Sequence, residues 1–152
     1  MKKIINGDKL FDIYGKEFNF HDGEILQITS IDNDLKFEIR TYLLMINPET
    51  NKFATIFHSI VTLIFKDVEG LDIKEIDTSS LILELYFEER PVENCFKVNL
   101  LNDISHPIRF KCKEIEIKSI EPVKDFEGFS EDEVKRIHEL EKKSGKKWPV
   151  EI

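Results

Sequence analysis

The residues best able to carry out chemistry in this 152-residue chain are its histidines, its cysteines and the carboxylates beside them. The four histidines lie far apart in the sequence: His21, His58, His106 and His138. His21 is followed directly by Asp22, and such a pair supplies two metal ligands in one class of phosphohydrolases. In that class the pair lies on a helix among further His and Asp residues. Here it stands at the entrance of a predicted strand, beside Gly23.

We interpret residues 20–23, Phe20-His21-Asp22-Gly23, as a structural turn. We expect Asp22 to accept backbone amide hydrogen bonds, His21 to bond a neighbouring carbonyl and Gly23 to adopt a positive φ. The alternative hypothesis is a small-ligand or metal-binding β domain that uses His21, Asp22 and Glu24. A stoichiometric metal ion, lost on His21→Ala, distinguishes the two.

Other signatures of catalysis or metal binding are absent from the sequence. It has no glycine-rich phosphate loop, no His-Glu-x-x-His, no Gly-x-Ser-x-Gly and no Cys-x-x-Cys. Cys95 and Cys112 lie in strand-like segments, where cysteine usually acts as a small buried hydrophobe. Asp32-x-Asp34 lacks the glycine and distal glutamate of a calcium loop. We therefore expect no enzyme activity, no cofactor and no metal site.

The elements that must position these residues are mostly strands. Alternation of apolar and polar residues predicts strands at 24–31, 35–45, 57–65, 71–73, 81–87, 96–100 and 108–120, the last as two strands or one bent strand. The strand at 57–65 is apolar on both faces, which indicates a central strand covered on both sides. No repeat or crossover helix interrupts the series, so the pattern favours an antiparallel sheet over β-α-β units.

A helix is predicted at each end of the chain. The first covers 8–14, with Asp8 as its N-cap. The second covers 129–145: Ser130 and Glu133 have capping-box spacing, and Gly145 follows as a stop. The predicted fold is mainly β (α+β), an antiparallel sheet folded into a sandwich or open barrel. We expect a single domain over 1–152 with its β core at 18–123.

The charge balance limits the partners. The net charge of −8 disfavours nucleic acid and an anionic membrane surface, which both require a basic patch. The sequence shows neither a signal peptide nor an apolar run of membrane-spanning length, so we expect a cytoplasmic location. A basic protein partner fits the charge best.

Most of the excess negative charge falls in one segment. Residues 67–93 contain nine acidic and two basic residues, a net charge of −7. This segment is either a solvated surface that aids solubility or a docking face for a cationic protein. For the second case the candidate partner-binding residues are the acidic and aromatic side chains Asp67, Glu69, Asp72, Glu84, Tyr86, Glu88, Glu89 and Glu93.

Three segments in the same order resemble the immunity protein 50 family. They are 20–25 (Phe-His-Asp-Gly-Glu-Ile), 63–71 (Leu-Ile-Phe-Lys-Asp-Val-Glu-Gly-Leu) and 110–122, which contains Cys112 and ends in Glu121-Pro122. The resemblance covers about 18–123 and leaves the C-terminal helix outside. It implies a bacterial immunity protein that binds and neutralises a co-encoded polymorphic toxin without any catalytic residue of its own. Nuclease toxins are commonly basic, so an acidic inhibitor would suit one.

Overall fold

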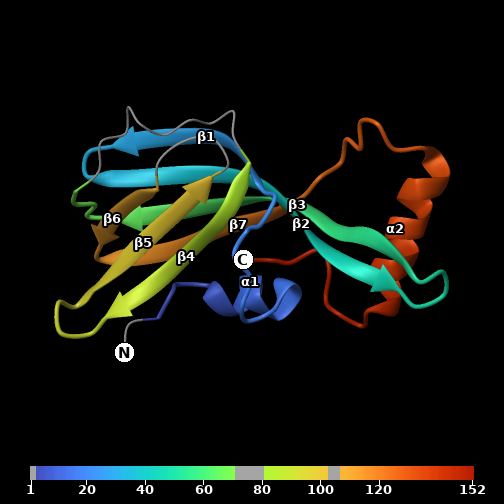
Figure 1. Ribbon diagram of the computed structural model, residues 1–152, viewed down its shortest axis with the longest axis horizontal. Coiled ribbons are helices and arrows are strands. Elements are labelled where there is room, and N and C mark those ends of the chain that lie inside the picture. Colours follow the sequence, from blue (N-terminus) through green and yellow to red (C-terminus); the bar gives the residue numbers. More distant parts are fainter. Residues whose placement is uncertain (1–2, 71–80, 103–106) are drawn as a thin grey trace.

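The computed structural model describes residues 3–70, 81–102 and 107–152. They form two antiparallel sheets with one helix near each end of the chain (Figure 1), which confirms the predicted fold class. The helices are α1 (Gly7–Tyr14) and α2 (Glu131–Lys143). The strands are β1 (Glu24–Ile31), β2 (Asp34–Asn47), β3 (Lys52–Lys66), β4 (Ile82–Arg90), β5 (Cys95–Asn102), β6 (Ile108–Cys112) and β7 (Glu114–Pro122).

The first three strands form one sheet with the last strand, and the three strands between them form the other. One sheet has the order β1-β2-β3-β7 and the other β4-β5-β6. The segment at 108–120, which the sequence left open, is two strands in different sheets, with Lys113 between them. The short strand predicted at 71–73 lies outside the described residues. Of the two architectures considered, the described strands form a sandwich.

Aromatic side chains hold the two sheets together. Phe65 of β3 has its ring centroid 5.1 Å from that of Phe37 on β2. Across the core, its centroid lies 5.2 Å from that of Phe110 on β6 and 6.0 Å from that of Phe87 on β4. Edge-on aromatic pairs of this kind stabilise a core by more than the burial of their surface alone. The phenylalanines of the alternating strands therefore form the centre of the core.

Two local predictions need correction. Helix α1 begins at Gly7 after Asn6, whose φ is 60°, and not after an Asp8 cap. The Asn6 side chain is drawn away from the helix because its amide donates to the carbonyl of Ile117, 3.2 Å away. Strand β3 is central, between β2 and β7, but its outer face is only half-buried at Ile60 and Ile64.

Strands β2 and β3 extend well beyond their neighbours. Pairing of β1 with β2 ends at Arg40, and pairing of β7 with β3 ends at Ser59. Residues 41–58 therefore form a two-stranded arm, and α2 packs against it at the far end of the molecule from most of the sandwich (Figure 1). Helix α2 has the predicted capping box between Ser130 and Glu133.

Candidate functional site

The turn at 20–23 joins the two sheets through its backbone. The Asp22 N–H donates to the carbonyl of Ile82, 2.8 Å away, and the Ile82 N–H donates back to the carbonyl of Gly23, 2.9 Å away. Ile82 begins β4 of the second sheet, whereas Gly23 leads into β1 of the first. The turn therefore fixes one edge of the second sheet to the first.

The side chains of this turn have mainly structural partners. His21 Nδ1 lies 2.8 Å from the carbonyl oxygen of Leu83, as the structural interpretation predicted. The predicted role of Asp22 as an acceptor of backbone amides is wrong for the described residues: its carboxylate lies 3.6 Å from His21 Nε2, and its backbone N–H donates to Ile82 instead. Within the residues that the structure describes, no group of three or more His, Cys, Asp or Glu side chains could hold a metal ion.

The expected positive φ at Gly23 is wrong. The left-handed residues of the turn are Phe20, with φ 60°, and Asp22, with φ 62°. Gly23 is needed for space: a Cβ there would lie 2.8 Å from the Phe20 carbonyl oxygen and 3.2 Å from Cγ2 of Ile39. The same Phe20 oxygen accepts the Gly23 N–H at 2.8 Å, so the turn closes tightly around this residue.

The predicted docking residues of β4 lie along one strand. Glu84, Tyr86 and Glu88 follow the outer side of β4, and Tyr86 is 42 % exposed. Glu89 alternates to the other side and is half-buried. We call Glu84, Tyr86 and Glu88 the β4 strip.

Basic side chains of the neighbouring strands stand beside the β4 strip. Glu88 is paired in register with Lys97 of β5, and Lys97 with Lys111 of β6. Two residues earlier on β4, Tyr86 is paired in register with Asn99 of β5, and Asn99 is paired with Arg109 of β6. The outer face of the second sheet is thus acidic along β4 and basic along β6.

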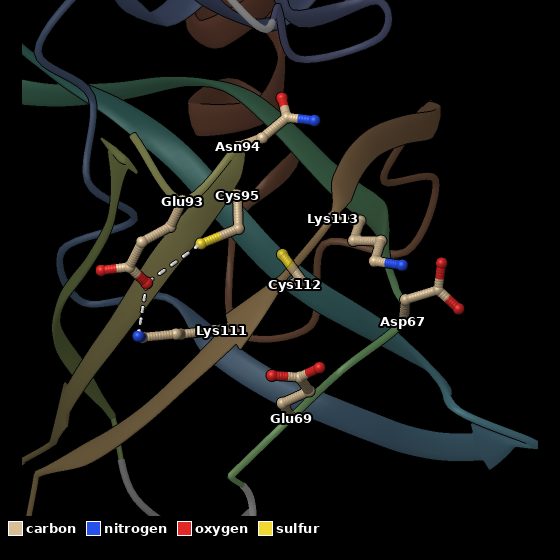
Figure 2. Close-up of a pocket in the computed structure, with 8 residues that line it drawn as sticks. All are labelled: Asp67, Glu69, Glu93, Asn94, Cys95, Lys111, Cys112 and Lys113. Atoms are coloured by element: carbon tan, nitrogen blue, oxygen red, sulfur yellow. Dashed lines mark hydrogen bonds and ion pairs between the residues drawn. The ribbon is translucent and has the colours of Figure 1, made fainter. Parts of the chain in front are cut away.

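The other predicted residues that the structure describes line a cavity of about 290 Å³ at one end of this sheet (Figure 2). The backbone of Glu69 pairs with that of Lys111, with N···O distances of 2.8 and 3.0 Å. The Glu93 carboxylate accepts a hydrogen bond from Lys111 Nζ at 2.5 Å, which lowers the pKa of Glu93 and raises that of Lys111. Asp67 also lines the cavity. Asp72 lies outside the described residues.

Within the described ranges, most acidic residues of 67–93 therefore fall into two groups, the β4 strip and the lining of the cavity. In the cavity group Glu93 is paired with Lys111, whereas in the β4 strip the Glu88 carboxylate lies 3.6 Å from the Arg90 guanidinium. Cys95 and Cys112, both buried and not joined in a disulfide, also line the cavity, and the Cys95 thiol lies 3.8 Å from the Glu93 carboxylate.

A buried polar cluster that the sequence did not predict holds α2 against the arm. Glu141 is only 6 % exposed, and its carboxylate accepts the N–H of Phe57 at 2.6 Å. His138 Nδ1 lies 3.0 Å from the same carboxylate. From α1, the Tyr14 hydroxyl donates to the Phe57 carbonyl at 2.5 Å, and burial raises the pKa of Tyr14 far above its usual value. Phe57 has a φ of 53° at a bulge opposite Tyr42.

The bulge also buries a histidine. His58 is 6 % exposed, with its ring 5.3 Å from that of Tyr42 and 5.4 Å from that of Phe126. Its Nε2 lies 2.8 Å from the hydroxyl of Thr55. Burial, followed by the positive charge of Arg40, lowers the pKa of His58, so the neutral ring is favoured.

Comparison of the chain with protein-family models, with curated proteins and with solved structures found no match. None of the helices within the described ranges is both long and apolar enough to span a membrane.

Proposed function

We propose that the chain is a non-catalytic immunity protein of the cytoplasm, which neutralises a cognate bacterial toxin by binding it and covering its active surface. The observation that carries the proposal is the β4 strip, in which an exposed tyrosine stands between two carboxylates on the outer face of an edge strand. The proposal also rests on the resemblance of three chain segments to immunity proteins.

The chemistry of the strip suits a cationic protein surface. Tyrosine is enriched among the residues that dominate binding energy, because it buries a large ring at little entropic cost. Glu84 and Glu88 lie on either side of Tyr86 and carry like charge, so a basic patch of the toxin would be attracted to this edge. Inhibition then follows from occupancy, because the strip needs no reacting group.

The turn at 20–23 has a supporting role in this proposal. It bonds the first residues of β4 to the other sheet, and an edge strand without that support would lose its outer hydrogen bonds. A rigid strip costs less ordering entropy when the partner binds. His21 and Asp22 thus act as positioning residues and not as ligands.

Charge reversal of the β4 strip tests the proposal. The double variant Glu84→Lys/Glu88→Lys is mixed with the toxin domain encoded beside the gene, and association is measured at two salt concentrations. We expect the association rate at low salt to fall by about tenfold or more, because electrostatic steering is lost. Tyr86→Ala should instead accelerate dissociation.

A matched control separates this face from net charge. Glu127→Lys/Glu139→Lys changes the net charge by the same amount at exposed positions near or within α2. We expect it to leave most of the association rate intact. Equal effects of the two double variants would contradict a role for the strip. A neighbouring toxin domain that the wild-type chain leaves unbound and active would overturn the proposal as a whole.

A further inference from the structure

The arm carries an open strand edge that no described segment covers. Beyond Arg40, β2 has β3 on one side and no strand on the other among residues 3–70, 81–102 and 107–152. On the opposite edge of the arm, α2 is bonded to β3 through Glu141 and the Phe57 amide. The arm is thus closed on its β3 side and open on its β2 side.

This open edge lacks the charges and prolines that usually prevent strand pairing, and its one bulge has the extra residue on β3, opposite Tyr42. Its residues, 41–47, have the sequence Thr-Tyr-Leu-Leu-Met-Ile-Asn, without a charge or a proline. Leu44 and Ile46 are 56 % and 55 % exposed, and Phe53, opposite Ile46 on β3, is 74 % exposed. Natural edge strands normally carry lysines, prolines or bulges that block addition of another strand.

We propose that a second copy of this chain pairs with the arm, with β2 antiparallel to β2 across a two-fold axis. The register follows from the length of the unpaired stretch 41–47, which we call the open window. It begins at Thr41, where β1 stops, and ends at Asn47, where the strand stops, so its centre is Leu44. Centring the two-fold axis there is the arrangement in which all seven residues find a partner.

The window is self-complementary about this centre. Thr41 then faces Asn47 of the second copy, Tyr42 faces Ile46 and Leu43 faces Met45, so polar residues meet at the ends and apolar residues in the middle. An isologous contact of this kind closes on itself and does not continue into a fibre.

The paired arms would also extend an apolar surface. Leu44 and Phe53 line a cleft of about 610 Å³ between the arm and α2, together with Leu140 of the helix. In the pair, the exposed faces of two such arms become one four-stranded sheet with Leu44 of each copy at its centre. Contacts between apolar side chains across the new strand pair supply a hydrophobic contribution that charge cannot supply here, because both copies have a net charge of −8.

The like charge of the copies gives the contact a distinctive salt dependence. Added salt screens repulsion between the two acidic chains, so self-association should strengthen as salt rises. Binding of a basic toxin to the β4 strip should weaken under the same change. The inference does not depend on the proposed function, and the two respond to salt in opposite directions.

Sedimentation velocity over a range of protein and salt concentrations tests the proposal on the full chain. We expect a monomer–dimer equilibrium whose dissociation constant rises at least about tenfold in Leu44→Lys, because two lysines of like charge would then face each other across the two-fold axis. Ile31→Lys is the matched control: Ile31 is 60 % exposed on the edge strand β1, and its replacement should leave the equilibrium unchanged. Circular dichroism of both variants monitors folding.

Cysteine cross-linking tests the register independently. Leu44→Cys should form a disulfide between copies under mild oxidation, because the two Cα atoms meet at the axis within the distance of about 7 Å that a disulfide allows. Phe53→Cys should not, since three strand spacings of about 4.8 Å separate its two copies. A chain that stays monomeric at every concentration and salt, or a dimer that survives Leu44→Lys and fails to cross-link through Leu44→Cys, would overturn the proposal.

Discussion

Replacement of Gly23 by alanine tests whether the turn at 20–23 depends on space. The added Cβ would lie 2.8 Å from the Phe20 carbonyl oxygen, closer than an ordinary carbon–oxygen contact. That oxygen cannot easily retreat, because it accepts the Gly23 N–H and belongs to a left-handed residue. The turn must therefore open, and the two bonds that join Ile82 to Asp22 and to Gly23 lengthen with it.

The size of the effect follows from the overpacking. Forcing a methyl group into a closed backbone site costs about 1–3 kcal/mol, and a 150-residue protein loses about 2–4 °C in Tm for each kcal/mol. We therefore expect Gly23→Ala to lower the Tm by about 2–12 °C. Urea denaturation measures the free energy, and hydrogen exchange at the Ile82 amide, which donates to Gly23, should quicken.

Gly128 provides the control, because it has the opposite constraint. Its φ is 82° and nothing lies within 4 Å of a Cβ built there. Gly128→Ala should lower the free energy of unfolding by about 1 kcal/mol because of the positive φ alone, and Gly128→Asn should lower it by less. At position 23, asparagine should destabilise the protein more than alanine does, because its side chain is larger. Unchanged stability in Gly23→Ala, or a more stable Gly23→Asn, would refute the steric explanation.

Two further predictions concern the junction of α2 with the arm. Glu141→Leu removes the acceptor of the buried Phe57 N–H and should cost about 1–3 kcal/mol in urea denaturation, whereas Glu141→Gln retains an acceptor oxygen and should cost less. Equal losses of stability in the two variants would show that the bond from the Phe57 N–H does not account for the effect of Glu141→Leu. For His58, the folded-state pKa is lowered, so the unfolded chain binds the proton more readily. Stability should therefore fall as the pH drops below the unfolded pKa of about 6.5, and His58→Phe, which keeps the aromatic contacts, should flatten that part of the profile. An unaltered slope in the variant would assign the pH dependence to other groups.

Local patterns in the sequence predicted local structure well. The capping box at Ser130 and Glu133 forms because both partners lie within one turn of the chain. The alternation that predicted most of the strands needs only the pleat of the backbone. By contrast, the buried position of Glu141 could not be predicted, because its partner is an amide at a bulge 84 residues away.

The charged surface was harder to predict for a similar reason. A count along 67–93 adds charges that the fold, where it is described, places in two separate groups, and it omits the bases that the fold brings beside them. Lys97, Arg109 and Lys111 come from strands outside that segment, yet they share a face with the β4 strip. Sequence summation therefore identified acidic residues but not the balance of charge around them.

The open edge of the arm is likewise a property of the neighbours. The alternation over 35–45 predicted a strand, but it contains no information on where β1 stops beside it. Only the register, with its last pair at Arg40, shows that residues 41–47 lack a second strand among the described residues.

Titration of the toxin's own activity with this chain tests the central claim most directly, that function is occupancy of a partner. The account predicts that residual activity falls in proportion to added chain and reaches its minimum at one chain per toxin molecule, with intact toxin recovered when the complex is dissociated. Complete inactivation by far less than one equivalent, abolished by His21→Ala, would show turnover at the turn and contradict the account.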